Sequence, residues 1–295
     1  MTTLARCTRW SAVAVVGLVV LGAGCKQSPS SRSAVARAGS TAQTAGEAAP
    51  PAAMPNRATE AAATGSAEAM TATERAIAKA AEGGRYAFVL FYRPGESGGE
   101  QMRSTFDQAK PALQAKAVFL TVDVGQGAET ALMGKYRVDT APLPLTLALA
   151  PNGAVAKAFT KPVDGDALRT AFVSQTTARV LKALQDGKLV ALCVQGENTR
   201  HNDESMAAAR ELVADERVGG QAEVMRLDPG DRDEAPLLEQ CNLSPTLEEA
   251  SIVLLVPPGT LVAAVSGATT KAKLLSALQQ GLSACGSGCG PSGCG

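Results

Sequence analysis

The chain has 295 residues, which is room for two domains and some unstructured sequence, because a domain usually takes about 100–200 residues. Its 28 Lys and Arg residues balance 28 Asp and Glu residues, so the formal net charge is zero and nucleic acid is not an expected ligand. A single histidine, His201, excludes metal sites built from several histidines.

The first 25 residues have the pattern of an export signal. A positively charged start precedes an apolar run over 12–21, too short to span a bilayer, and small residues then lead to Cys25. This arrangement resembles the bacterial lipoprotein signal, although Gly22 stands where that family usually has leucine. The resemblance implies a diacylated Cys25 that anchors the chain in the cell envelope, facing the periplasm or the surface. Ordinary secretory cleavage near Ala23 or Gly24, leaving Cys25 as a plain thiol, is the alternative.

Residues 26–72 are expected to form a disordered linker. They contain no Leu, Ile, Phe, Tyr or Trp, and so have little that could offset the entropy of folding. A flexible chain of this length has a reach of roughly 40 Å. It would hold a folded domain clear of a membrane.

The next hundred residues predict one α/β unit. Its apolar run over 87–92 is typical of a buried parallel strand, and Pro111 is expected to bend or end the helix that follows it. Asn152-Gly153 predicts a tight hairpin turn. The expected elements are a helix (73–82), a strand (87–92), a helix containing Met102 and Phe106, a strand (117–123), a short helix (128–136), two hairpin strands (145–150 and 154–159) and a closing helix (164–176).

A second unit repeats this order, which makes the chain a tandem repeat. Asp123 precedes Tyr136 by the same interval as Asp228 precedes Cys241, and a hairpin follows each. The expected elements are a helix (178–186), a strand (189–194), a loop (195–203), a helix (204–216), a strand (223–228), two hairpin strands (252–256 and 260–265) and a closing helix (270–282).

Both units resemble the thioredoxin fold. Segment 136–142 (YRVDTAP) is similar to the stretch that ends at the cis-proline of that family, and 256–263 (VPPGTLVA) is similar to its final hairpin. The resemblance implies two three-layer α/β/α domains, over 73–176 and 177–283. It also implies that Pro142 is the cis-proline, with Pro144 as a competitor. Another α/β sandwich, built from a βαβ unit and a hairpin, is the alternative fold.

The residues that carry thioredoxin chemistry are absent. In the family, two cysteines two residues apart begin the helix after the first central strand, and the helix start favours the thiolate. The equivalent loops here read SGGE over 97–100 and ENTRHND over 197–203. We therefore expect no thiol exchange at either loop, and no enzyme of this kind. Residues 248–250 also contain no proline, so the substrate groove is expected in the first unit only.

Two cysteines lie inside the second unit. Cys193 is in an apolar strand and is expected to be a buried, unreactive side chain. Cys241 is expected on a short helix near the surface. A disulfide between them is left open.

Polar residues of the second unit offer weaker candidates. His201 could act as a general base, but a solvated loop with Asp203 as helix cap is favoured because no nucleophile is near. Asp228, Asp231 and Asp233 lack the glycine and final glutamate of an EF-hand loop and are expected in a charged surface turn.

The tail, 284–295, is the chain's unusual chemical feature. Cys285, Cys289 and Cys294 lie in a glycine-rich sequence. Three thiolates could enclose Cu(I) or Zn(II), or two of them could form a disulfide, or the tail could be passive. Their spacing matches no zinc motif.

These observations favour one function and leave two others open. We expect a non-catalytic, membrane-anchored tandem thioredoxin-like lipoprotein that binds an envelope protein through a degenerate groove. The alternatives are a thiol–disulfide redox protein that uses the tail cysteines and a protein that captures copper or zinc with them.

Overall fold

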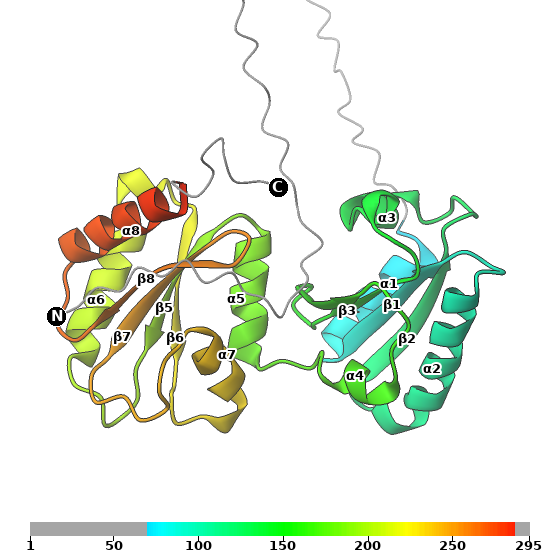
Figure 1. Ribbon diagram of the computed structural model, residues 1–295, viewed down its shortest axis with the longest axis horizontal. Coiled ribbons are helices and arrows are strands. Elements are labelled where there is room, and N and C mark those ends of the chain that lie inside the picture. The colour runs from blue at the N-terminus through cyan, green and yellow to red at the C-terminus, as the bar shows by residue number, and fades with distance from the viewer. Residues whose placement is uncertain (1–69, 287–295) are drawn as a thin grey trace, which may run out of the picture. The chain divides into compact units, whose positions relative to one another are not determined.

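The computed structural model describes residues 70–286, which form two four-stranded sheets with helices packed on both faces (Figure 1). The predicted signal, Cys25, nearly all of the predicted linker, Cys289 and Cys294 lie outside this range. No helix among the described residues is long and apolar enough to cross a bilayer.

The first domain has a mixed sheet in the order β2-β1-β3-β4. Strands β1 and β2 are parallel, whereas β3 runs antiparallel to both β1 and β4. Its elements are α1 (Ala72–Glu82), β1 (Tyr86–Tyr92), α2 (Ser97–Leu113), β2 (Ala117–Asp123), α3 (Thr130–Lys135), a 3₁₀ turn (Val138–Thr140), β3 (Leu145–Leu149), β4 (Val155–Phe159) and α4 (Gly165–Arg169).

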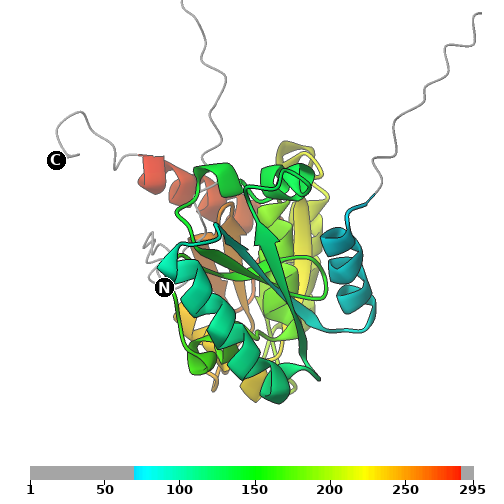
Figure 2. The same ribbon diagram turned by 90° about the vertical axis from the view of Figure 1, so that its right-hand side faces the viewer.

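Alternate side chains of β1 build two separate cores, one on each face of the sheet. Phe88 and Leu90 pack against α2 and α4, while Val89 and Phe91 pack against α1 and α3. Figure 2 shows α2 lying across one face of the sheet. All seven residues of β1 are buried, as the uninterrupted apolar run predicted.

Helix α2 runs through Pro111 and ends at Leu113, so the proline does not end it. Proline removes one helical hydrogen bond. Here Ala109 and Leu113 on either side of it are buried against the core, and this packing holds the last turn in place.

The single closing helix expected over 164–176 is wrong, because the chain breaks there into α4 and α5 (Gln175–Gln185). The Tyr86 hydroxyl holds the break: it donates to the Val173 carbonyl and accepts from the Val173 N–H, both at 3.0 Å. Ser174 then caps α5 by accepting from the Thr177 N–H at 3.0 Å. These long-range contacts override the local helical pattern.

The second domain repeats the architecture, with sheet order β6-β5-β7-β8 and the same parallel and antiparallel pairings. Each domain therefore has the thioredoxin-like topology, and the predicted tandem fold is confirmed. Besides α5, its elements are β5 (Leu189–Val194), α6 (Asn202–Val213), a 3₁₀ turn (Glu216–Val218), β6 (Ala222–Leu227), a 3₁₀ turn (Arg232–Glu234), α7 (Ala235–Gln240), β7 (Ser251–Val256), β8 (Thr260–Ser266) and α8 (Lys271–Gly286).

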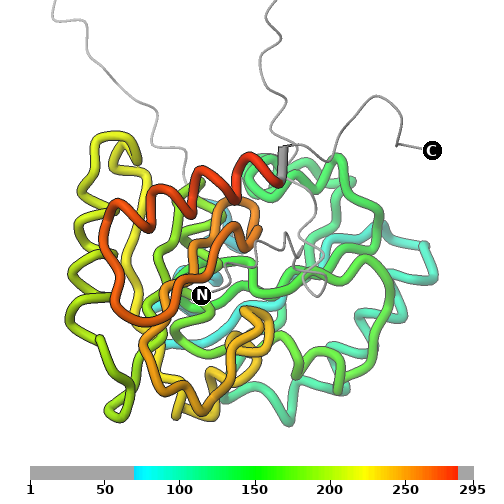
Figure 3. The backbone as a smooth tube through the Cα atoms, turned by 60° about the vertical axis from the view of Figure 1, so that its left-hand side comes forward, coloured from blue at the N-terminus to red at the C-terminus, as the bar shows by residue number. Residues whose placement is uncertain are grey.

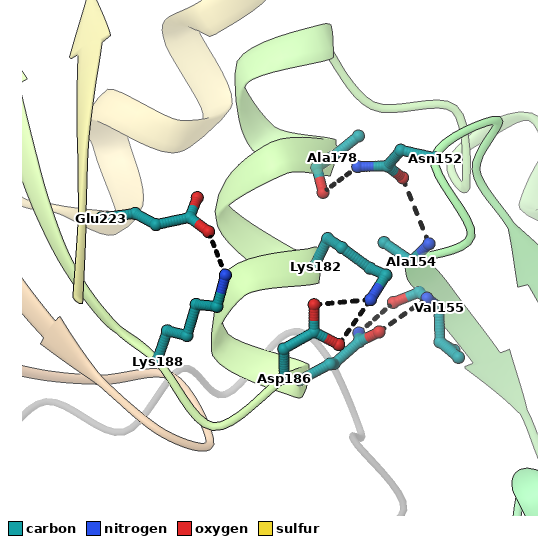
Figure 4. Close-up of polar contacts among 9 residues, drawn as sticks. Asn152, Ala154, Val155, Ala178, Lys182, Asp186, Lys188 and Glu223 are labelled. Carbon is teal, nitrogen blue, oxygen red and sulfur yellow. Dashed lines mark hydrogen bonds and ion pairs between the residues drawn. The ribbon is translucent and has the colours of Figure 1, made fainter. Parts of the chain in front are cut away.

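Helix α5 binds the β3–β4 hairpin through side-chain amides (Figure 4). The Gln185 amide pairs with both backbone groups of Val155, at 2.9 and 2.8 Å, as a neighbouring strand would. Asn152 donates to the Ala178 carbonyl at 2.8 Å. Of the predicted Asn-Gly turn, only Gly153 takes a positive φ, of 80°.

Helix α8 lies against β8 (Figure 3) and continues four residues past the predicted end at Leu282. The two elements approach closely at Gly281, where a Cβ atom would overlap the Val262 carbonyl oxygen. Glycine at this position is what lets the helix reach the strand. Cys285 lies in the last turn of this helix.

Candidate functional site

In the first domain, the loop after β1 and the segment before β3 meet at one edge of the sheet. They do so because β3 is antiparallel to β1 and Phe91 pairs with Leu145. The loop 93–96 thus enters α2 beside Pro144. This is the edge at which thioredoxins carry their cysteines.

The cis peptide bond of this domain joins Leu143 to Pro144, so the expectation that Pro142 is the cis-proline is wrong. Pro144 is the residue next to β3 and therefore lies at the sheet edge, whereas Pro142 belongs to the chain that follows the 3₁₀ turn. A Cβ atom at Gly98 would lie 3.1 Å from Cδ of Pro144. The first turn of α2 and the cis-proline are thus in contact.

The first turn of α2 presents polar and small residues where the family has thiols. Glu96 is the N-cap residue, is exposed, and makes no side-chain capping bond. Gly99 packs on the Tyr92 side chain: a Cβ atom added at Gly99 would lie only 3.0 Å from the Cβ atom of Tyr92. The Arg103 guanidinium covers the Tyr92 ring at 5.4 Å from its centroid. The site can make contacts, and the residues 96–99 at its helix start include no thiol.

In the second domain the equivalent loop is braced by its own side chains. Thr199 Oγ1 accepts from the Gly196 N–H at 2.9 Å and lies 2.6 Å from Oδ1 of Asn202. The Asn202 amide donates to the Gly196 carbonyl at 2.9 Å. These bonds close the loop onto the start of α6.

The same loop is bound to the segment before β7. The Arg200 N–H donates to the Glu248 carbonyl, and the Ala250 N–H donates to the Arg200 carbonyl, both at 2.9 Å. A pocket of about 560 Å³ opens between the loops after β5 and β6 and this segment. The sequence analysis expected a groove in the first unit only and did not predict this pocket, whose three walls are far apart in the chain.

His201 lies at the start of α6 with φ of 64°, and its Nδ1 is 2.9 Å from Oε2 of Glu204. The expectation that Asp203 caps this helix is wrong: His201 is the N-cap residue and Asp203 lies in the first turn. Asn202 is hydrogen-bonded to Thr199 and to the Gly196 carbonyl, and α6 begins at Asn202, one residue before Asp203.

The two thiols of the second domain are buried on opposite faces of the sheet. Cys193 packs with α6 and α8, whereas Cys241 packs with α5 and α7. Both are free, so the disulfide left open between them is excluded by the sheet that separates them. Cys241 is 3% exposed, which makes the expected position near the surface wrong. Burial raises the pKa of each thiol to about 12.

The acidic residues after β6 bind backbone rather than one another. Asp228 accepts from the Gly230 N–H and Asp231 from the Asp233 N–H, each at 2.9 Å. Within residues 70–286 no group of three or more His, Cys, Asp or Glu side chains could hold a metal ion. The proposed tail ligands Cys289 and Cys294 lie outside that range.

Comparison with known proteins finds likenesses only among solved structures, and these are distant. No family model and no curated protein matches the chain. Solved structures that it resembles are thioredoxin-like. The first two thioredoxin domains of Saccharomyces cerevisiae Eps1p are 12% identical over 78% of this chain and 99% of that one, with a TM-score of 0.28.

Two further structures belong to the same fold class. The zinc-bound form of human ERp44 is 12% identical over 70% of this chain and 57% of that chain, with a TM-score of 0.31. Deadhead, a germline-specific thioredoxin of Drosophila melanogaster, is 23% identical over 31% of this chain and 81% of its own, with a TM-score of 0.27. Eps1p and ERp44 align along most of the present chain, and Deadhead along one domain's length.

Proposed function

We propose that the chain is a non-catalytic binding protein of a bacterial envelope, anchored through Cys25, whose first domain holds a protein partner at the edge formed by α2 and Pro144. The single observation that supports a non-catalytic role is the spacing and burial of the cysteines. No two of the seven are separated by two residues, and the two inside the second domain are buried with a raised pKa.

The chemistry of the first-domain edge supports binding. Thiol exchange needs a thiolate at the start of α2, and Glu96, Ser97, Gly98 and Gly99 supply none. The cis-proline contact with Gly98 is retained all the same. An edge that has this contact and no thiol is suited to holding a chain without oxidising it.

Site-specific photo-crosslinking in cells tests the partner. A photoreactive amino acid in place of Ser97, at the proposed edge, is expected to trap a discrete partner protein on the full-length chain. The matched control replaces Gln114, which caps the opposite end of the same helix. The same adducts from both positions, or none from Ser97, would count against the proposal.

The redox alternative and the metal alternative both depend on the tail cysteines. Insulin reduction by the full-length reduced protein tests the first: we expect no turnover. Turnover that disappears when Cys285, Cys289 and Cys294 are changed to serine would favour the redox function instead. Titration with Cu(I) and Zn(II) tests the second, with uptake of about one ion per chain, lost in that triple variant, as the result that favours metal capture.

A further inference from the structure

We infer that the second domain carries a binding pocket for an organic cation, the ammonium or guanidinium group of a basic ligand. The pocket lies at the edge of the second sheet and is separate from the first-domain edge on which the proposed function rests. Three loops line it, at 196–200, 228–230 and 245–248. Its volume of about 560 Å³ is within the range of small-ligand sites.

The pocket is built before any ligand arrives. Its first wall is fixed by the braces between Thr199, Gly196 and Asn202, and its third wall by the backbone bonds of Arg200. Gly196 lets the first two walls approach: a Cβ atom there would lie 3.3 Å from Oδ1 of Asp228. A preformed site loses little entropy when it binds.

The charges in the pocket favour a cation. Glu197, Asp228 and Glu248 line it, opposed by Arg200. The Arg200 guanidinium lies 3.1 Å from a carboxylate oxygen of Glu249, outside the lining, and 4.0 Å from one of Glu248, so Glu197 and Asp228 are the lining carboxylates that remain for a ligand. Within residues 70–286, no lysine, arginine or histidine side chain forms an ion pair with Glu197 or Asp228.

The apolar part of the lining identifies the kind of cation. Pro229, Pro245 and Leu247 share the walls with the carboxylates. A lysine or arginine side chain has the matching form, a methylene stem that packs on apolar surface and a charged head that binds carboxylates. Apolar walls provide no ligand for a bare metal ion, and the described residues contain no set of three side chains that could bind one.

A basic side chain of a protein and a free polyamine present the same chemistry. The probes are therefore N-acetyl-arginine methylamide, N-acetyl-lysine methylamide and spermidine, titrated by calorimetry into the full chain in detergent. The neutral isostere N-acetyl-citrulline methylamide is the ligand control. We expect the cations to bind and citrulline not to, with affinity falling as salt is raised.

The variant E197Q/D228N is expected to weaken cation binding by tenfold or more. Its matched control, D107N/E211Q, removes the same charge from exposed helix positions outside the pocket. Circular dichroism of both variants checks the fold. Stronger binding of the amino-acid amides assigns the site to a protein side chain and stronger binding of spermidine assigns it to a polyamine, and either supports a cation pocket.

Three results would overturn the inference: no binding of any cation at millimolar concentration, equal binding of citrulline, or an equal loss in both variants. Partner trapping at Ser97 is a separate measurement on the other domain. Failure of the cation pocket thus leaves the proposed function standing, and the reverse also holds.

Discussion

Cys193 and Cys241 are the two free, buried thiols of the second domain. Each lies inside an apolar core, where a thiolate would lose its hydration, so burial raises the pKa of both to about 12. The Arg210 charge acts in the opposite direction on Cys193 and does not outweigh burial. Thiol exchange needs thiolate. We therefore expect neither cysteine to supply thiolate near neutral pH.

We predict that native Cys193 and Cys241 resist alkylation at pH 8. A pKa near 12 in place of 9 lowers the thiolate population about 1000-fold, and burial further limits access. Iodoacetamide labelling followed by peptide mass spectrometry, with and without urea, measures this. Rapid labelling of either residue in the folded chain would show that it is reachable and reactive.

Asp215 links two helices through charge. Its side chain, 8% exposed, binds Arg217 beyond the end of α6 and the Lys271 ammonium at the start of α8, 3.1 Å away. The bonds from Arg217, followed by that from Lys271, hold the pKa of Asp215 well below its usual range. The ionised carboxylate therefore stabilises the folded state.

Asp215→Asn should lower the free energy of unfolding at pH 7. A depressed pKa gives stability that is present above the unfolded value, about 3.9, and is lost as pH falls below it. The difference between variant and wild type in urea unfolding should thus shrink below pH 4. Asp186→Asn, which breaks the exposed Lys182 pair seen in Figure 4, is the control and should cost at most about 1 kcal/mol.

At the scale of elements, one hydroxyl separates α4 from α5. Tyr86→Phe removes both hydrogen bonds to Val173 and leaves those backbone groups without that partner. We predict a loss of about 1–3 kcal/mol in the free energy of unfolding. Tyr92→Phe is the control, because the Tyr92 hydroxyl makes no hydrogen bond among the described residues. Equal urea midpoints for both variants would contradict this role for Tyr86.

The contact of α8 with β8 depends on a single missing side chain. Alanine is ordinarily preferred to glycine inside a helix by about 1 kcal/mol. Gly281→Ala should nevertheless destabilise the chain by roughly 1–2 kcal/mol, because overpacking against the Val262 carbonyl costs more than that gain. Gly134→Ala in α3, with no atom within 4 Å of the new Cβ, should be neutral or stabilising. Urea unfolding of both variants compares them, and a stabilised Gly281→Ala variant would refute the close approach.

At the scale of the whole molecule, the proposed attachment to a membrane rests on Cys25. If Cys25 is acylated, the full-length protein should partition with membranes, because two or more acyl chains anchor stably. Cys25→Ser should then release or mislocalise it. Fractionation and mass spectrometry of the N-terminal peptide measure this. An unmodified N-terminus in wholly soluble wild-type protein would rule out the anchor.

Local patterns were enough to predict the strands and the repeat. The uninterrupted apolar runs that became β1 and β5 are buried on both faces, and such runs have few alternatives in a folded domain. The matching intervals in the two halves placed Asp123 and Asp228 at equivalent strand ends. The absence of a pair of cysteines two residues apart is also evident from the sequence alone.

What only the tertiary structure decided depends on contacts between distant residues. The cis peptide bond precedes Pro144 rather than Pro142. Pro144 lies directly before β3, whose first residue, Leu145, pairs with Phe91. The Tyr86 hydroxyl divides a helical pattern 87 residues away. The pocket has walls from three loops that meet where β5 and β6 end and β7 begins. Sequence periodicity reports which face of an element is buried, but only the packed sheet determines which loops meet at its edge.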